Sequence, residues 1–426
     1  MRPKNIPPEI WHLILSYLPL SDLKLVLLVC KDFYRVGTRE KMWKHVILSR
    51  QKLCMFDVDD ELAVIKMDRF EFKPNIDIKD YVDDTMDIDE SQARNICRNV
   101  LKYCRSKEHV RELSMEEANL LHIGQNLLGD CISNLETVTF RYCKLSKEDI
   151  LHIVSSISTS EHLKSINLSS MDFSHIPSKL LEEAVKSLEK FYINHTSLNV
   201  EQCMSLIDGI RSNPLLKYLG LGGQQCIKQL PRELLKDMIP LNLKILELSG
   251  TNLTPPQMET ILLKISQLPT LEKLDLTRNI LTEIDKDILA ETLSNVEELG
   301  LMQTELSRDQ VDALFRQILK KQKTKEVNLY EVNLKGVEKS LLAETVKTME
   351  TAVLFFTSIT FDQISTLMIA IKKGSKLSTL YLNQDLLNRV ETNLLCDALT
   401  SLEFVYLLRT RLSRETVTEL VSRGKQ

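Results

Sequence analysis

The stretch Leu271-Glu272-Lys273-Leu274-Asp275-Leu276-Thr277-Arg278-Asn279-Ile280-Leu281 decides the fold of this chain. It places apolar residues at its first, fourth, sixth and eleventh positions. Twelve copies of this pattern recur at intervals of 25 to 28 residues and begin at Val110, Leu135, Leu163, Leu188, Leu216, Leu243, Leu271, Val296, Thr324, Met349, Leu377 and Leu402. Self-similarity at such a period indicates a solenoid, in which each repeat stacks on the next.

Each copy begins with alternating apolar and polar residues, which predicts a short strand. In the copy that starts at Leu243, for example, Leu243, Leu246 and Leu248 are expected to face the core. A helix is expected after each strand. The predicted fold class is therefore an α/β solenoid of about twelve strand–helix repeats with a parallel inner sheet.

Every second helix is preceded by the signature of a capping box, in which a polar N-cap residue and a glutamine three positions later bond to each other's backbone amides. The four pairs are Asn199 with Gln202, Thr254 with Gln257, Ser307 with Gln310, and Thr360 with Gln363. These signatures predict where four of the helices begin.

The leucine pattern resembles leucine-rich repeats, and the long, helix-backed units are similar to the ribonuclease-inhibitor type. This resemblance implies a horseshoe with strands on the inner face and helices outside. Twelve strands spaced about 4.8 Å apart would give an inner face on the order of 55 Å long. A surface of that size suits a protein partner better than a small molecule, which prefers an enclosed pocket.

Composition describes a globular protein, with 43% hydrophobic and 27% charged residues. The net charge of −4 argues against a nucleic-acid partner. We expect no membrane span, because no apolar run reaches about eighteen residues, and no signal peptide, because Glu9, His12 and Asp22 interrupt the first 25 residues.

The nine cysteines do not form the pattern of a disulfide framework or a metal site, because no CxxC or HxxxH occurs. Cys131, Cys203 and Cys396 fall among core leucines, where a free thiol acts as a small hydrophobe. We therefore expect free thiols, a reducing compartment, and a cytoplasmic or nuclear protein, or both.

The first 50 residues predict three short helices that are rich in large apolar side chains, including Trp11 and Trp43. So small a unit cannot bury all of them alone. Something must cover the excess, either the repeats or a partner, and a docking module would meet this need.

Five blocks of this segment, in order, resemble the F-box motif: Ile6-Pro7-Pro8-Glu9-Ile10, Ile14-Leu15-Ser16-Tyr17-Leu18-Pro19, Asp22-Leu23, Leu28-Val29-Cys30-Lys31-Asp32-Phe33, and Trp43. The resemblance implies that the module binds the Skp-type adaptor of cullin-based ubiquitin ligases. The residues it assigns to that contact are Ile6, Pro7, Ile10, Leu13, Ile14, Leu18, Leu23, Val29 and Phe33. The alternative is a helical cap that only shields the first repeat.

We expect three regions: the F-box at 1–50, an acidic linker with an entry helix at 51–109, and the solenoid at 110–426. Residues 51–92 hold thirteen acidic and five basic residues, a net charge of −8. Such runs are typical of solvated, extended chain.

The outward strand positions of the last four copies carry large side chains, whereas those of earlier copies are small or charged. The predicted substrate-binding residues are Tyr330, Phe355, Phe356, Tyr381, Tyr406 and Arg409. Tyrosine and arginine are enriched at interface hot spots. The alternative is that the rings pack on each other or cover the open end of the solenoid. Arg141, Tyr142, Tyr192 and His195 form a second, smaller group.

No phosphate-binding glycine loop, nucleophile elbow or metal motif occurs, so we expect no catalytic residue, no metal and no cofactor. The expected function is a non-catalytic substrate adaptor of a Skp–cullin–F-box ubiquitin ligase, whose partners are the Skp-type adaptor, the cullin and a protein substrate. The alternative is a scaffold or inhibitor that acts outside a ligase.

Overall fold

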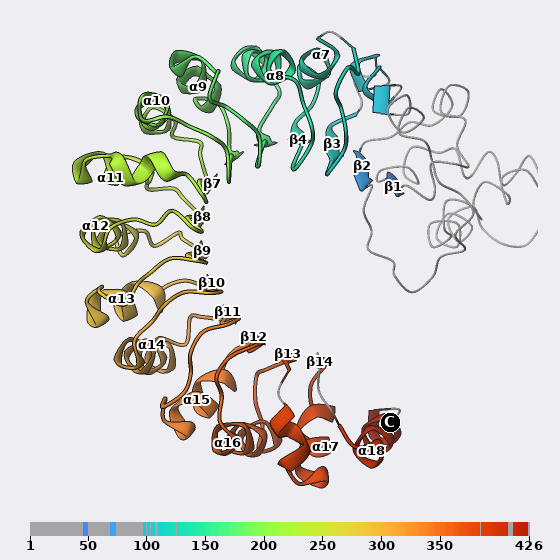
Figure 1. Ribbon diagram of the computed structural model, residues 1–426, viewed down its shortest axis with the longest axis vertical. Coiled ribbons are helices and arrows are strands. Elements are labelled where there is room, and N and C mark those ends of the chain that lie inside the picture. The colour runs from blue at the N-terminus through green and yellow to red at the C-terminus, as the bar shows by residue number, and fades with distance from the viewer. Residues whose placement is uncertain are drawn as a thin grey trace, which may run out of the picture. The chain divides into compact units, whose positions relative to one another are not determined.

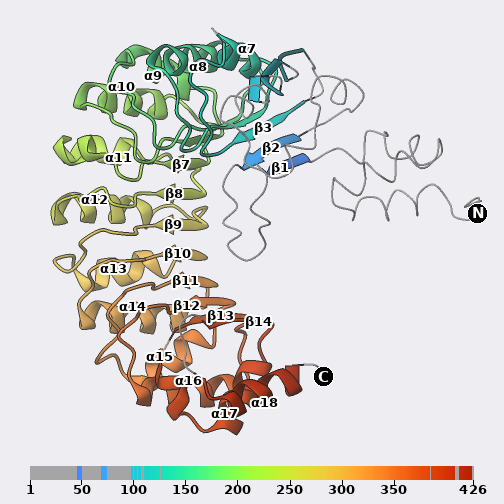
Figure 2. The same cartoon turned by 45° about the vertical axis from the view of Figure 1, so that its right-hand side comes forward.

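The computed structural model describes residues 46–49, 69–73, 97–98, 100–102, 104–106, 110–124, 126–383, 385–407 and 412–424. The chain divides into two compact units, Met1–Asn213 and Pro214–Gln426. In both units parallel strands alternate with helices, and the strands and helices lie on opposite sides (Figures 1 and 2).

The first unit contains a parallel sheet whose strands follow the order of the sequence. Its strands are β1 (Val46–Ser49), β2 (Arg69–Lys73), β3 (Glu112–Met115), β4 (Thr137–Thr139), β5 (Ser165–Asn167) and β6 (Lys190–Tyr192). Its helices are α7 (Leu127–Ile132), α8 (Lys147–Thr159), α9 (Ser178–Val185) and α10 (Val200–Arg211), preceded by helical residues within 97–106.

The second unit has the same organisation. Its strands are β7 (Tyr218–Gly220), β8 (Ile245–Glu247), β9 (Lys273–Asp275), β10 (Glu298–Gly300), β11 (Glu326–Asn328), β12 (Thr351–Val353), β13 (Thr379–Leu382) and β14 (Phe404–Leu407). Its helices are α11 (Arg232–Asp237), α12 (Pro255–Ile265), α13 (Lys286–Leu293), α14 (Arg308–Lys321), α15 (Lys339–Val346), α16 (Phe361–Lys372), α17 (Thr392–Thr400) and α18 (Arg414–Gly424), with 3-10 turns η2 (Gln225–Gln229) and η3 (Asp385–Arg389).

The strands β3–β14 fall on the predicted copies, so the α/β solenoid expected from the sequence is confirmed. The core is the predicted one: Leu243, Leu246 and Leu248 are each 0% exposed. The strand–helix units fit repeats of the leucine-rich type. At the last strand, β14, Val405 and Leu407 are half-buried rather than buried.

Two strands precede the first predicted repeat. Phe70 on β2 aligns with Val46 on β1 on one side and with Leu113 on β3 on the other, and all three strands are parallel. β1 lies in the region predicted as the F-box and β2 in the predicted acidic linker, and no leucine pattern marks a repeat in either place. The boundaries at 50 and 109 stay predictions.

The capping boxes form as predicted at α10, α14 and α16. At α12 the glutamine half of the box is present, because Gln257 Oε1 accepts from the Thr254 amide at 3.1 Å.

Close packing of α9 against α10 depends on Gly209, because a Cβ there would lie 2.5 Å from the Glu182 carbonyl oxygen.

Among the described residues, five cysteines are buried free thiols, as expected: Cys97, Cys104, Cys131, Cys143 and Cys396. Cys203 and Cys226 are also buried. Each of these two is disulfide-bonded, so the expectation of free thiols is wrong for them.

Candidate protein-binding surface

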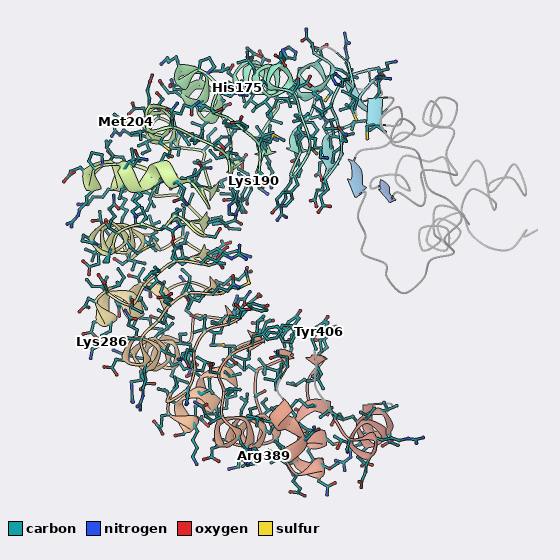
Figure 3. The ribbon with its side chains drawn as sticks, viewed as in Figure 1. His175, Lys190, Met204, Lys286, Arg389 and Tyr406 are labelled. Atoms are coloured by element: carbon teal, nitrogen blue, oxygen red, sulfur yellow. The ribbon has the colours of Figure 1, made fainter. Side chains whose placement is uncertain are left out.

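The strand side of the second unit carries a row of rings that we call the aromatic ridge: Tyr330, Phe355, Phe356, Tyr381 and Tyr406. Tyr330 follows β11, Phe355 and Phe356 follow β12, and the two other tyrosines lie on β13 and β14. Tyr406 projects from the strand side, whereas Lys286 and Arg389 lie on the helix side (Figure 3). The ridge therefore runs across four neighbouring strands.

Each ring of the ridge contacts the next. Tyr330 and Phe356 meet edge to face, with centroids 5.2 Å apart, and Phe355 and Tyr381 do the same at 5.5 Å. Tyr381 and Tyr406 stack at 4.3 Å with only 4° between their planes. The ring centroids of Phe355 and Phe356 lie 6.5 Å apart, and this contact connects the Tyr330–Phe356 pair with the rings of Phe355, Tyr381 and Tyr406. These contacts restrict the rings before any partner arrives, which lowers the entropy cost of binding.

The ridge remains accessible although its rings pack on one another. Tyr406 is 47% exposed, and the other four rings are half-buried. Mutual packing, which the sequence analysis posed as the alternative to binding, and accessibility therefore occur together at this surface.

The turns after the strands hold their residues in a repeated left-handed conformation. The φ angles are 57° at Arg278, 55° at Gln303, 59° at Glu331 and 57° at Phe356. The first three side chains form a hydrogen-bonded ladder: Arg278 Nε donates to Gln303 Oε1 at 2.6 Å, and Gln303 Nε2 donates to Glu331 Oε2 at 2.6 Å. At Phe356 the backbone amide donates to Asn383 Oδ1 at 2.8 Å, which fixes the last turn of the series.

Tyr381 in the ridge has a shifted pKa. Desolvation raises the pKa of Tyr381, and the neighbouring Tyr406 and the more distant Glu326 charge raise it further. The Tyr381 phenol is therefore neutral at physiological pH and acts as a hydrogen-bonding and stacking group.

Five of the six predicted substrate-binding residues come together in the ridge, and Arg409 lies outside the described residues. Their role in binding stays a prediction. Phe404 was not among the predicted residues, although it is 51% exposed on β14 and shares the strand face of Tyr406. The third position of the copy, which Phe404 occupies, is polar in most other copies. The alternation of inward and outward side chains along the strand could have identified Phe404 as outward-facing.

The second predicted group lies in the first unit. The Arg141 guanidinium lies over the Tyr142 ring, 4.8 Å from its centroid, and Tyr142 is 46% exposed. Tyr192 is half-buried on β6, and His195 is exposed with φ at 56°.

A hollow of about 400 Å³ lies between α13 and α14 on the helix side, lined by side chains of both charges such as Lys286, Asp309 and Arg316.

Among the described residues, no group of three or more histidine, cysteine or acidic side chains could hold a metal ion. In the same part of the chain, no helix is long and apolar enough to cross a membrane.

The nine predicted adaptor contacts, from Ile6 to Phe33, all lie outside the described residues. The family model for F-box-like domains matches residues 4–49. No curated protein matches the chain. The chain thus carries an F-box-like region at its N-terminus, followed by strand–helix repeats that fit the leucine-rich type.

Proposed function

We propose that this protein is the substrate-recognition subunit of a Skp–cullin–F-box ubiquitin ligase. The observation that carries the proposal is the F-box-like match at residues 4–49, on the same chain as an accessible aromatic ridge. F-box domains generally bind Skp-type adaptors, so the match supports that kind of partner. Tyrosine is enriched at the hot spots of protein interfaces, so the accessible tyrosines of the ridge support a protein substrate.

The proposed mechanism is templating. The F-box-like region would hold the chain on the adaptor and cullin, and the ridge would hold the substrate near the ubiquitin-conjugating enzyme. Because one chain would hold both the ligase and the substrate, the encounter of the substrate with the ubiquitin-conjugating enzyme would become intramolecular, at a high effective concentration. In this proposal no residue of the chain takes part in ubiquitin transfer, so the protein is not itself an enzyme.

The proposed location is the cytoplasm, the nucleus or both, where ligases of this class meet their substrates. Five buried free thiols are consistent with a reducing compartment. The disulfide bonds at Cys203 and Cys226 argue in the other direction, and in a reducing compartment we expect both to be reduced.

The test is co-purification of the full chain with the Skp-type adaptor and the cullin. We expect the wild type to bind and a Pro7→Ala, Leu18→Asp double variant to lose binding. The matched control is Pro214→Ala, Leu241→Asp, which makes the same two changes at exposed positions of the second unit. Circular dichroism would confirm that all three chains are folded.

A folded wild type that binds no adaptor would overturn the proposal and favour a scaffold or inhibitor. Equal binding by the double variant would show that the resemblance assigned the wrong contact residues. If the wild type binds no adaptor, the F-box-like region would serve another purpose, such as capping the first repeat.

A further inference from the structure

The strand side of the second unit carries a second feature beside the aromatic ridge, which we call the acidic strip. It comprises the outward positions of β8–β11, where four carboxylates, Glu247, Asp275, Glu298 and Glu326, accompany a single lysine, Lys273. The corresponding positions of β3–β6 in the first unit hold one acidic residue, Glu112, and one lysine, Lys190. The excess of negative charge is therefore specific to this face.

Strand register places three charges of the strip side by side. Lys273 aligns with Glu298, and Glu298 aligns with Glu326. Lys273 Nζ pairs with Glu298 Oε2 at 3.0 Å, which leaves the Glu326 carboxylate beside a second carboxylate. Directly opposed like charges destabilise a sheet. An added cation would relieve this repulsion.

The protonation behaviour of Glu326 agrees with this geometry. Desolvation raises its pKa, the Glu298 charge raises it further, and Lys273 lowers it. The carboxylate thus lies in a half-buried place where its own negative charge is unfavourable. A basic side chain brought to this place would be attracted by both carboxylates.

The acidic strip and the aromatic ridge meet at β11. Glu326 begins that strand, and Tyr330 and the exposed Glu331 follow its end. From Glu326 the same register leads through Thr351 and Thr379 to Phe404, and from Asn328 through Val353 to Tyr381 and Tyr406. Rings and carboxylates therefore lie on one continuous strand face. Ring faces attract cations, as carboxylates do, so both features favour the same ligand chemistry.

We propose that this face binds a basic protein segment, in which lysine or arginine side chains lie on the acidic strip and stack on the aromatic ridge. The proposal rests on the proposed function, because it names the class of substrate segment that the adaptor would capture. An acidic segment would be repelled by the strip. A neutral apolar segment would cover the Glu326 carboxylate without supplying a charge to balance it.

The first experiment pans a phage-displayed library of random twelve-residue peptides against the full chain. We expect selected peptides to be enriched in lysine and arginine beside apolar residues. Their binding should weaken as salt rises, because exposed charges are screened over about 8 Å at physiological ionic strength. Enrichment of acidic or neutral sequences, or no enrichment, would overturn the proposal.

The second experiment measures one selected basic peptide against charge variants. Glu326→Lys should weaken binding about tenfold or more, because an attraction becomes a repulsion. Glu326→Gln, which keeps the shape, should have a smaller effect in the same direction. The control is Glu283→Lys, which makes the same charge change at an exposed position between β9 and α13. Equal binding by Glu326→Lys and Glu283→Lys would contradict the proposal.

The experiments distinguish failure of the ligase proposal from failure of the proposal that this face binds a basic segment. Glu326→Lys should still co-purify with the Skp-type adaptor, because the change lies outside the F-box-like region. Selection of basic peptides by a chain that does not bind the adaptor would keep this inference and overturn the ligase role. A chain that binds the adaptor but selects no basic peptides would overturn this inference and keep the ligase role.

Discussion

At the residue scale, four glutamines join neighbouring repeats: Gln202, Gln257, Gln310 and Gln363. Each is at most 7% exposed. The amide of Gln310 donates to the carbonyls of Leu281 and Ile284 at 2.7 Å, and that of Gln363 donates to the carbonyls of Leu334 and Val337 at 2.9 and 2.8 Å. One side chain thus begins a helix and satisfies two buried carbonyls of the preceding repeat.

Replacing Gln310 tests this double role. Gln310→Ala removes the glutamine half of the capping box and takes the side-chain donor from the buried Ile284 carbonyl, which costs about 1–3 kcal/mol. The Leu281 carbonyl still accepts from the Ile284 amide at 3.0 Å. We expect a loss of about 2 kcal/mol in the free energy of unfolding, measured by urea denaturation. Gln310→Glu should lose at least as much, because it keeps the acceptor for the Ser307 amide but places oxygen against the two carbonyls.

The matched control is Gln317→Ala on the same helix, α14. Its Oε1 has no hydrogen-bond partner among the described residues. We expect a change under about 1 kcal/mol there. A Gln310→Ala protein as stable as Gln317→Ala would show that the bonds to the preceding repeat contribute little.

Buried hydroxyls fill a similar role at the ends of the strands. Thr251, Thr304 and Thr357 each donate to the carbonyl three residues earlier, at 3.1, 2.7 and 2.9 Å. In the repeat of β9 the residue is Asn279, whose amide donates to the carbonyls of Leu248 and Leu276 at 2.8 and 2.9 Å. Such polar side chains let the chain turn away from the core without leaving backbone groups unpaired.

At the scale of elements, the helical residues within 97–106 pack one face into the core of the first unit. Cys97, Val100, Leu101 and Cys104 are at most 3% exposed. Burial raises the pKa of Cys97 and Cys104 from 9.0 to about 12, and that of Cys143, in the turn after β4, to about 12 as well. Each thiol therefore keeps its proton in the folded state well above the pH at which the unfolded chain loses it.

This difference predicts a loss of stability in alkali. Between about pH 9 and pH 12 the unfolded state binds fewer protons than the folded state, so stability falls as pH rises. At pH 10 each of the three thiols should contribute a loss of about 1.4 kcal/mol. Urea denaturation at pH 8 and pH 10 measures the difference.

Cys104→Ala should reduce that pH-dependent loss by about 1.4 kcal/mol. Leu101→Ala, a buried truncation on the same helix without a titrating group, should leave the loss unchanged while lowering stability at both pH values. If Cys104→Ala and Leu101→Ala lost stability equally between pH 8 and pH 10, the buried thiol would not be the cause.

At the scale of the whole molecule, the proposed function requires docking and capture on one chain. Immobilised Skp-type adaptor should retain a labelled basic peptide only through a chain competent for both. At a peptide concentration below the wild-type Kd, a mixture of the F-box double variant Pro7→Ala, Leu18→Asp with Glu326→Lys should retain about a tenth of the wild-type amount or less, because one chain cannot dock and the other binds the peptide about tenfold more weakly. The wild type at the same concentration is the positive control, and retention by the mixture at the wild-type level would contradict single-chain bridging.

Several features could be predicted from the sequence because they depend on residues only a few positions apart. The leucine spacing predicted where β3–β14 lie, since period two sends alternate side chains to opposite faces of a strand. The capping pairs lie three residues apart, and they predicted the starts of α10, α12, α14 and α16. The same alternation placed Tyr381 and Tyr406 on the outer face of their strands.

The sequence by itself determined the repeat, its core, its helix starts and the outward position of the rings, because these follow from residues only a few positions apart. The tertiary structure decided the pairing of β1 and β2 with β3, the reach of Gln310 into the preceding repeat, and the adjacency of Lys273, Glu298 and Glu326. These contacts join residues about 25 or more positions apart. Their alignment depends on the lengths of the intervening turns and helices and on how the repeats stack, which no local pattern records.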